Sequence, residues 1–126
     1  MKTVADYHNV ISEFPEFFTL FLGELVIVSG TALSRRPVLE MMLKATKVPY
    51  HRLFTYPGEW TDNTGKLKSK LWKIKKIIEE KPDLLIDDDL TTLLAVKKKL
   101  PETKCLLWVT DDYKVEKTEK DEKISY

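Results

Sequence analysis

Disulfides are the first feature that this sequence lacks. One cysteine, Cys105, stands among 126 residues, so no disulfide can form within the chain. This excludes a small secreted module that is held together by disulfides. No apolar run approaches the roughly 20 residues that a membrane-spanning helix needs. The first residues, Met1–Asp6, lack the apolar core of a signal peptide because an acidic residue arrives too early.

A surplus of charge of either sign is also missing. Lys and Arg number 21, Asp and Glu number 20, and the formal net charge is +1. This balance is not that of a nucleic-acid coat, although it leaves room for a local basic patch. Hydrophobic residues make up 43% and charged residues 33%, which is typical of globular proteins. We therefore expect a small soluble cytoplasmic protein that does not bind membranes.

The chain divides into one domain and a tail. A length of 126 residues suits a single domain, which we place over residues 1–110. Residues 111–126 are rich in Lys and Glu and carry few large apolar side chains. We interpret them as a flexible, charged C-terminal tail.

Short apolar runs alternate with longer amphipathic segments along the domain. The predicted strands are 2–5, 25–28, 51–56, 84–86 and 105–109. Helices are predicted to begin at Ser12, Ser34 and Ser69, with a last helix through Leu93 and Val96. The alternation is typical of an α/β three-layer sandwich around a mostly parallel five-stranded sheet.

Two segments of the domain allow more specific predictions. In the helix after Ser34, the side chains expected to face the core are Val38, Met41, Met42 and Ala45. The stretch 57–66 is dense in turn-forming residues and is predicted to be a loop.

Polar side chains gather where the predicted strands end. Asp6 follows the first strand, Ser29 the second, and Asp87, Asp88 and Asp89 follow the fourth. The carboxyl ends of parallel strands form the ligand-binding edge of such a sheet, so these groups are expected to converge. Asp6 and Asp89 are open to a second interpretation as helix caps, and Ser29 to one as a turn residue. Carboxylates without an excess of His or Cys favour Mg²⁺ as the bound cation.

The order of these residues resembles that of the motifs of the haloacid dehalogenase superfamily of phosphotransferases. The first motif of that family, an apolar strand followed by Asp-x-Asp, is matched at Asp6, with His8 in the place of the second Asp. The second, an apolar strand ending in Thr or Ser, is matched at Ser29, and the fourth, paired acids after a strand, at Asp87 and Asp88. The resemblance covers about residues 1–110 and implies the family's Rossmannoid fold.

The resemblance also implies roles for these residues. Asp6 would be the nucleophile that attacks phosphorus and becomes an aspartyl phosphate. Ser29 would donate a hydrogen bond to a phosphoryl oxygen. Asp6, Asp87, Asp88 and the backbone carbonyl of His8 would hold Mg²⁺.

The third motif of the family is a lysine at the start of a helix, and four lysines compete for it. We choose Lys70, which falls in the first turn of the helix predicted to begin at Ser69, and place Lys68 second. Lys66 and Lys73 remain as further candidates. The chosen lysine would neutralise charge on the nucleophile and on the transferring group.

His8 departs from the family pattern, because phosphatases of the family usually carry Asp there. That position donates a proton to the leaving group, and imidazole can do the same near its usual pKa of roughly 6.5. The resemblance therefore implies a Mg²⁺-dependent phosphohydrolase that acts through Asp6. A catalytically inactive binding or regulatory module is the alternative.

The chain has no segment long enough for the cap domain that many family members insert. Capless members tend to act on large substrates. Gly30 and Arg35, which follow the second motif, are expected to contact the substrate. Trp60 and Tyr56 either stack on a base or pack against the third strand. The expected substrate is a nucleotide or the phosphorylated end of a polynucleotide.

Overall fold

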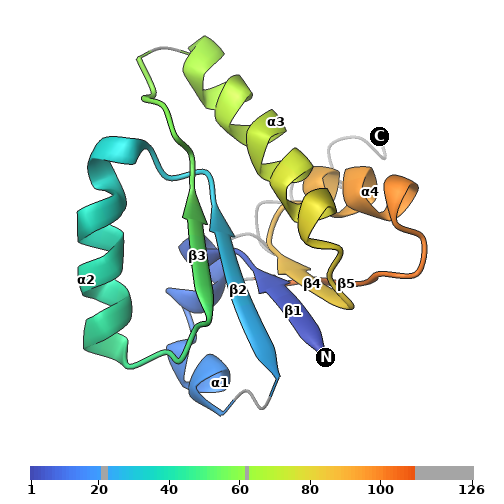
Figure 1. The fold of residues 1–126 in the computed structure, drawn as a ribbon, viewed down its shortest axis with the longest axis horizontal. Coiled ribbons are helices and arrows are strands. Elements are labelled where there is room, and N and C mark those ends of the chain that lie inside the picture. Colours follow the sequence, from blue (N-terminus) through green and yellow to red (C-terminus); the bar gives the residue numbers. More distant parts are fainter. Residues whose placement is uncertain (21–22, 62, 110–126) are drawn as a thin grey trace, which may run out of the picture.

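A computed structural model describes residues 1–20, 23–61 and 63–109. The predicted tail, residues 111–126, lies outside them. The described chain contains a five-stranded sheet in which all neighbouring strands are parallel, in the order β3-β2-β1-β4-β5 (Figure 1). The strands are β1 (Lys2–Ala5), β2 (Glu24–Ser29), β3 (Arg52–Thr55), β4 (Leu84–Asp87) and β5 (Lys104–Leu107).

Helices cover both faces of this sheet. They are α1 (Pro15–Thr19), α2 (Arg36–Thr46), α3 (Asn63–Glu80) and α4 (Leu90–Lys99). One buried cluster joins the sheet to α1 and α2 through Phe18 and Leu39, and another joins it to α3 and α4 through Ile77 and Val96. The predicted α/β three-layer sandwich is thus confirmed, and its sheet is wholly parallel.

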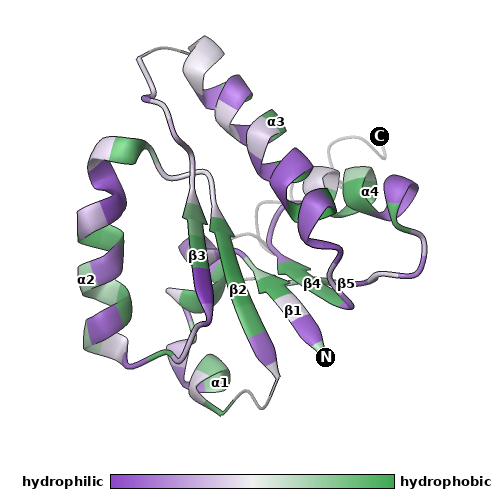
Figure 2. Cartoon of the chain, in the orientation of Figure 1, coloured by the Kyte–Doolittle hydropathy of each residue, from purple (hydrophilic) through white to green (hydrophobic). Residues whose placement is uncertain are grey.

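Strand β2 shows why the central strands carry continuous apolar runs. Leu25 and Ile27 point into the cluster beneath α1 and α2, whereas Val26 and Val28 point into the cluster beneath α3 and α4. All four are fully buried, because helices lie on both sides of the strand. Figure 2 shows the resulting apolar band across the centre of the sheet.

The buried face of α2 differs from the prediction. Leu39 and Leu43 are buried against the sheet, four residues apart. The residues predicted to face the core are exposed instead: Val38, Met41, Met42 and Ala45. The helix carries two apolar stripes, and helical spacing alone does not say which stripe meets the sheet.

The start of α3 also differs from the prediction. The helix begins at Asn63, inside the stretch predicted to be a loop. Ser69, the predicted first residue, is buried within the helix, and its hydroxyl donates to the carbonyl of Gly30 at 2.6 Å. The early start carries the first turns of α3 beyond the carboxyl ends of the strands (Figure 1).

Two smaller differences concern helix caps. Ser12 and Ser34 do not cap α1 and α2; the residues that precede these helices are Phe14 and Arg35. Ser34 instead binds the carboxylate of Glu59 through its backbone N–H and its hydroxyl. None of the helices in the described ranges is both long and apolar enough to cross a membrane.

Candidate active site at the carboxyl ends of the strands

A pocket of about 910 Å³ opens at the carboxyl edge of the sheet. Its floor includes Asp6 from the end of β1, Ser29 from the end of β2 and Asp88 just after β4. The chain passes from β1 to β2 and β3 on one side, and returns to place β4 on the other side of β1. Such a reversal of strand order is the usual place for a ligand in open α/β sheets.

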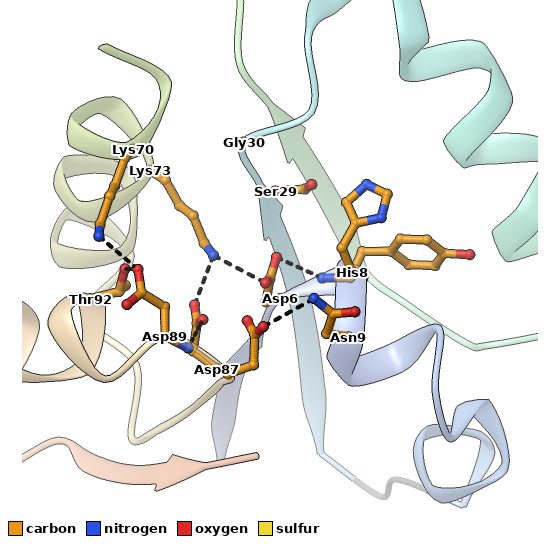
Figure 3. Close-up of polar contacts among 12 residues, drawn as sticks. Asp6, His8, Asn9, Ser29, Gly30, Lys70, Lys73, Asp87, Asp89 and Thr92 are labelled. Atoms are coloured by element: carbon orange, nitrogen blue, oxygen red, sulfur yellow. Dashed lines mark hydrogen bonds and ion pairs between the residues drawn. The ribbon is translucent and has the colours of Figure 1, made fainter. Parts of the chain in front are cut away.

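A buried lysine joins two of the strand-end carboxylates. Nζ of Lys73 lies 3.2 Å from Oδ2 of Asp6 and 2.8 Å from Oδ2 of Asp87 (Figure 3). All three residues are less than 10% exposed. Asp6 also accepts from the backbone N–H of Tyr7, and Asp87 from that of Asp89, each at 2.9 Å. The ion pairs and these backbone hydrogen bonds hold both carboxylates in place.

The lysine beside the expected nucleophile is therefore Lys73 and not Lys70. Lys70 pairs with Asp89, its Nζ lying 2.9 Å from Oδ2 of that residue. The prediction placed the first turn of the helix, just after Ser69, beside the strand ends. Helix α3 begins six residues earlier, at Asn63, so the turn that lies beside the strand ends is a later one and carries Lys73. Lys70 precedes Lys73 by three residues, so its backbone lies about 4.5 Å further along the helix axis, toward the turns of α3 that extend beyond the carboxyl ends of the strands.

Asp88 completes a group of three carboxylates. Oxygens of Asp6, Asp87 and Asp88 lie within 4.8 Å of one another. Asp88 accepts a hydrogen bond from the side-chain amide of Asn9 at 3.2 Å. Asn9 has a φ of 62°, a left-handed conformation that Asn tolerates better than most residues. The wide turn Tyr7–Ile11 after β1 thus brings an amide against the third carboxylate.

The charges at this site do not balance. Burial, followed by repulsion from Asp87 and Asp88, raises the pKa of Asp6 to about 8, and the attraction of Lys73 only partly opposes this. Burial raises the pKa of Asp87 as well. Burial would lower the pKa of Lys73, but its two carboxylate partners outweigh that effect and raise it. One lysine faces three carboxyl groups, so the site favours a further cation or a bound proton.

The donors present fit a hard divalent cation. Three carboxylates converge, and oxygen ligands of this kind are those that Mg²⁺ prefers. Oδ2 of Asp87 is buried and, apart from its ion pair with Lys73, accepts no hydrogen bond from any described group. A cation among these oxygens would offset the repulsion that raises the pKa of Asp6.

Hydroxyl groups form the other side of the floor. The Oγ atoms of Ser29 and Thr31 lie 2.7 Å apart, and Nε2 of His8 lies 3.1 Å from Oγ1 of Thr31. Burial, then the positive charges of Lys73 and Arg35, lowers the pKa of His8. The shift favours the neutral form of the imidazole. The backbone carbonyl of His8, the ligand that the resemblance implies, remains a prediction.

Asp89 caps a helix, which is the second of the two interpretations given for it in the sequence analysis. Its side chain accepts from the backbone N–H of Thr91 at 3.1 Å, at the start of α4. Although burial opposes the shift, hydrogen bonds from Lys70 and Thr92 lower the pKa of Asp89. It caps α4 and anchors Lys70, and it is not one of the three converging carboxylates.

Gly30 and Arg35, the residues expected to contact the substrate, also line the pocket. Arg35 is exposed at its edge, and the carbonyl of Gly30 accepts from the side chains of Ser69 and Trp60. The two aromatic residues expected either to stack on a base or to pack against the third strand have different surroundings. Trp60 lines the pocket, whereas the ring of Tyr56 packs against Trp72 of α3, with centroids 5.9 Å apart.

Sequence reasoning missed two polar groups of the site and ranked a third too low. Thr31 and Asn9 stand in the segments after β2 and β1, but nothing in the sequence pattern singles them out. Lys73 is one of the four candidate lysines, but not the one that the predicted helix start favours. The sequence feature that could have identified Lys73 is its position four residues before Ile77. Residues at this spacing lie on the same face of a helix, and Ile77 is fully buried.

Comparisons with known proteins support the fold alone. No protein-family model matches the sequence, and no curated protein matches it. A crystal structure of an uncharacterized protein from Corynebacterium glutamicum ATCC 13032 Kitasato is similar, with a TM-score of 0.50 and 14% sequence identity. The similarity covers 93% of this chain and 90% of that chain. Membership of the haloacid dehalogenase superfamily stays a prediction.

Proposed function

We propose that the protein is a cytoplasmic, Mg²⁺-dependent phosphohydrolase that acts through an aspartyl phosphate at Asp6. The observation that carries this proposal is the position of Lys73, within 3.2 Å of Asp6 and 2.8 Å of Asp87 on the floor of an open pocket. A buried nucleophilic carboxylate beside a fixed ammonium group suits attack on an anionic phosphate.

In the proposed reaction, an oxygen of Asp6 attacks phosphorus and the bond from phosphorus to the leaving alcohol breaks. Water then attacks the phosphorus of the acyl phosphate, releases inorganic phosphate and restores Asp6. Lys73 stabilises the charge on the transferring group, and the hydroxyls of Ser29 and Thr31 donate to its oxygens. The carboxylates of Asp6, Asp87 and Asp88 would hold Mg²⁺, which would supply positive charge that favours the ionised form of the nucleophile.

His8 favours a second candidate function. Burial, together with the positive charges of Lys73 and Arg35, lowers the pKa of His8, and this disfavours the protonated form that would have to donate to a leaving alcohol. A site that binds a phosphorylated ligand without turnover is consistent with that observation. The two candidates differ in whether phosphate is released.

Phosphate release from p-nitrophenyl phosphate, measured with and without Mg²⁺, separates them. We expect Mg²⁺-dependent release that Asp6→Asn abolishes and Asp83→Asn retains, because Asp83 lies at the opposite edge of the sheet and binds the backbone of Lys2. Folding of each variant is checked by circular dichroism. A folded wild type that releases no phosphate with Mg²⁺, from this ester or from a nucleoside monophosphate, would contradict the enzyme and favour the binding module.

A further inference from the structure

We propose that Trp60 is a stacking platform that makes nucleotides the substrates of this pocket. The phosphate would lie at Asp6 while the planar base on its alcohol side lies against the indole ring. The proposal rests on the phosphohydrolase function above, and it concerns which phosphate ester the site accepts.

Trp60 presents an unused aromatic surface to the pocket. Its indole N–H donates to the carbonyl of Gly30 at 3.0 Å, so the single polar atom of the ring is already satisfied. The side chain nevertheless remains 49% exposed and lines the cavity. A large ring with its polar group bonded and its surface open offers a base a flat partner for stacking.

The backbone that carries Trp60 is fixed before any ligand arrives. Four hydrogen bonds join the segment 56–59, after β3, to the segment 31–34, after β2. They are Tyr56 N–H to Thr31 O, Leu33 N–H to Gly58 O, and the backbone N–H and hydroxyl of Ser34 to the carboxylate of Glu59. A platform that is ordered in advance loses little entropy when it binds a ring.

Unpaired cations accompany the ring. Arg35 and Lys66 line the same pocket, and no carboxylate in the described ranges pairs with either of them. Lys70, which also lines it, is held by Asp89. Two free cations beside an aromatic surface suit a ligand that is both anionic and aromatic.

The spacing favours a nucleotide over an aryl phosphate. Trp60 belongs to the loop after β3 and is anchored over the end of β2, so it stands one to two strand spacings, about 5 to 10 Å, from β1 and Asp6. A ribose between phosphate and base can span such a distance. In phosphotyrosine the ring is attached directly to the phosphate oxygen, and the ring would lie closer to the floor.

Equilibrium binding to the Asp6→Asn protein tests the proposal, because this variant cannot turn its ligand over. Titration calorimetry with Mg²⁺ compares adenosine 5′-monophosphate with ribose 5-phosphate, which lacks the base. We expect the nucleotide to bind more tightly. Adding Trp60→Ala should reduce its advantage by about 5- to 150-fold, the range that stacking on an aromatic side chain supplies.

Two further variants serve as controls. Trp60→Phe keeps an aromatic surface and should retain most of the advantage. Phe14→Ala removes another side chain that is 49% exposed but lies outside the pocket, and it should leave the ratio of the two affinities unchanged. Equal binding of the two ligands, or a ratio insensitive to Trp60→Ala, would overturn the proposal, as would tighter binding of phosphotyrosine.

The same titrations separate this proposal from the one it rests on. In one outcome, the ratio of the two affinities depends on Trp60 but the wild type releases no phosphate. This outcome contradicts the phosphohydrolase and supports the nucleotide site. Phosphate release without an effect of Trp60→Ala contradicts the nucleotide site alone. An oligonucleotide with a 5′-phosphate that binds more tightly than the mononucleotide would assign the base to a polynucleotide end.

Discussion

At the scale of single residues, Lys73 is the group on which the site depends. It is 8% exposed and is the cation shared by two buried carboxylates, Asp6 and Asp87. A buried ion pair contributes little net stability, but removing one of its charges strongly lowers the free energy of unfolding. The charge that remains is then buried without a partner. Lys70 pairs with the half-exposed Asp89, where an ion pair contributes little.

We therefore expect Lys73→Met to lower the free energy of unfolding by about 3 kcal/mol. Lys70→Met, the matched control on the same helix, should lower it by less than about 1 kcal/mol. Urea denaturation of both variants measures the difference. Equal losses in the two variants would show that Lys73 is not the compensating charge at the site.

The pKa of Asp6 gives this site a defined pH dependence. The folded protein holds a proton on Asp6 up to a pKa of about 8, whereas the unfolded chain releases it near 3.8. Between these values unfolding releases a proton, so this group makes stability fall as pH rises, by at most about 1.4 kcal/mol per pH unit. Asp6→Asn removes the effect, because an amide does not titrate.

Without divalent cations, we expect Asp6→Asn to exceed the wild type in stability by a margin that grows from pH 5 to pH 8. Taking the difference between the two proteins cancels the titration of groups outside the site, Asp89 included. Urea denaturation at pH 5, 6.5 and 8 provides the measurement. A margin that stays constant or shrinks over this range would mean that Asp6 is ionised in the folded protein.

At the scale of elements, the site depends on how closely α3 approaches the end of β2. A Cβ atom on Gly30 would lie 2.7 Å from Oγ of Ser69, which donates to the carbonyl of the same glycine. Cβ of Ser69 would be 3.9 Å away, so the hydroxyl alone is in the way. Glycine at this position lets α3 approach closely and sets the height of Lys73 above the sheet.

Gly30→Ala should therefore cost about 1–3 kcal/mol, the penalty of displacing a buried, hydrogen-bonded hydroxyl. The same substitution in a Ser69→Ala background should cost clearly less, since the conflicting atom is gone. A double-mutant cycle by urea denaturation measures this coupling. Additive costs would show that the two residues do not restrict each other.

The sequence predicts some of these elements better than others, for physical reasons. The strands and the carboxylates after them follow from local pattern, since a strand buried on both faces is continuously apolar and its polar neighbours mark its end. The buried face of α2 and the register of α3 do not follow from the local sequence pattern. Both depend on contacts with distant segments, such as Leu39 against the sheet and Ser69 against Gly30.

At the scale of the whole molecule, the two ends of the strands differ in function. The amino ends carry ion pairs that hold the elements together, and the carboxyl ends carry the candidate site. At the amino edge, Glu80 forms ion pairs with Lys2 and Arg52 and ties α3, β1 and β3 together. At the carboxyl edge, three carboxylates converge with a single buried lysine, an arrangement that costs stability and is typical of functional sites. The uncompensated charge lies where a phosphate ester and a cation would bind.

The central claim is that Asp6 accepts the phosphoryl group, and trapping the intermediate tests it most directly. The protein is mixed with p-nitrophenyl phosphate and Mg²⁺ and quenched in acid, and borohydride then reduces any acyl phosphate to the alcohol. Mass spectrometry of the peptides should find residue 6 converted from aspartate to homoserine, with no conversion when Mg²⁺ is left out. Phosphate release without conversion at residue 6, or conversion at another carboxylate, would contradict the account.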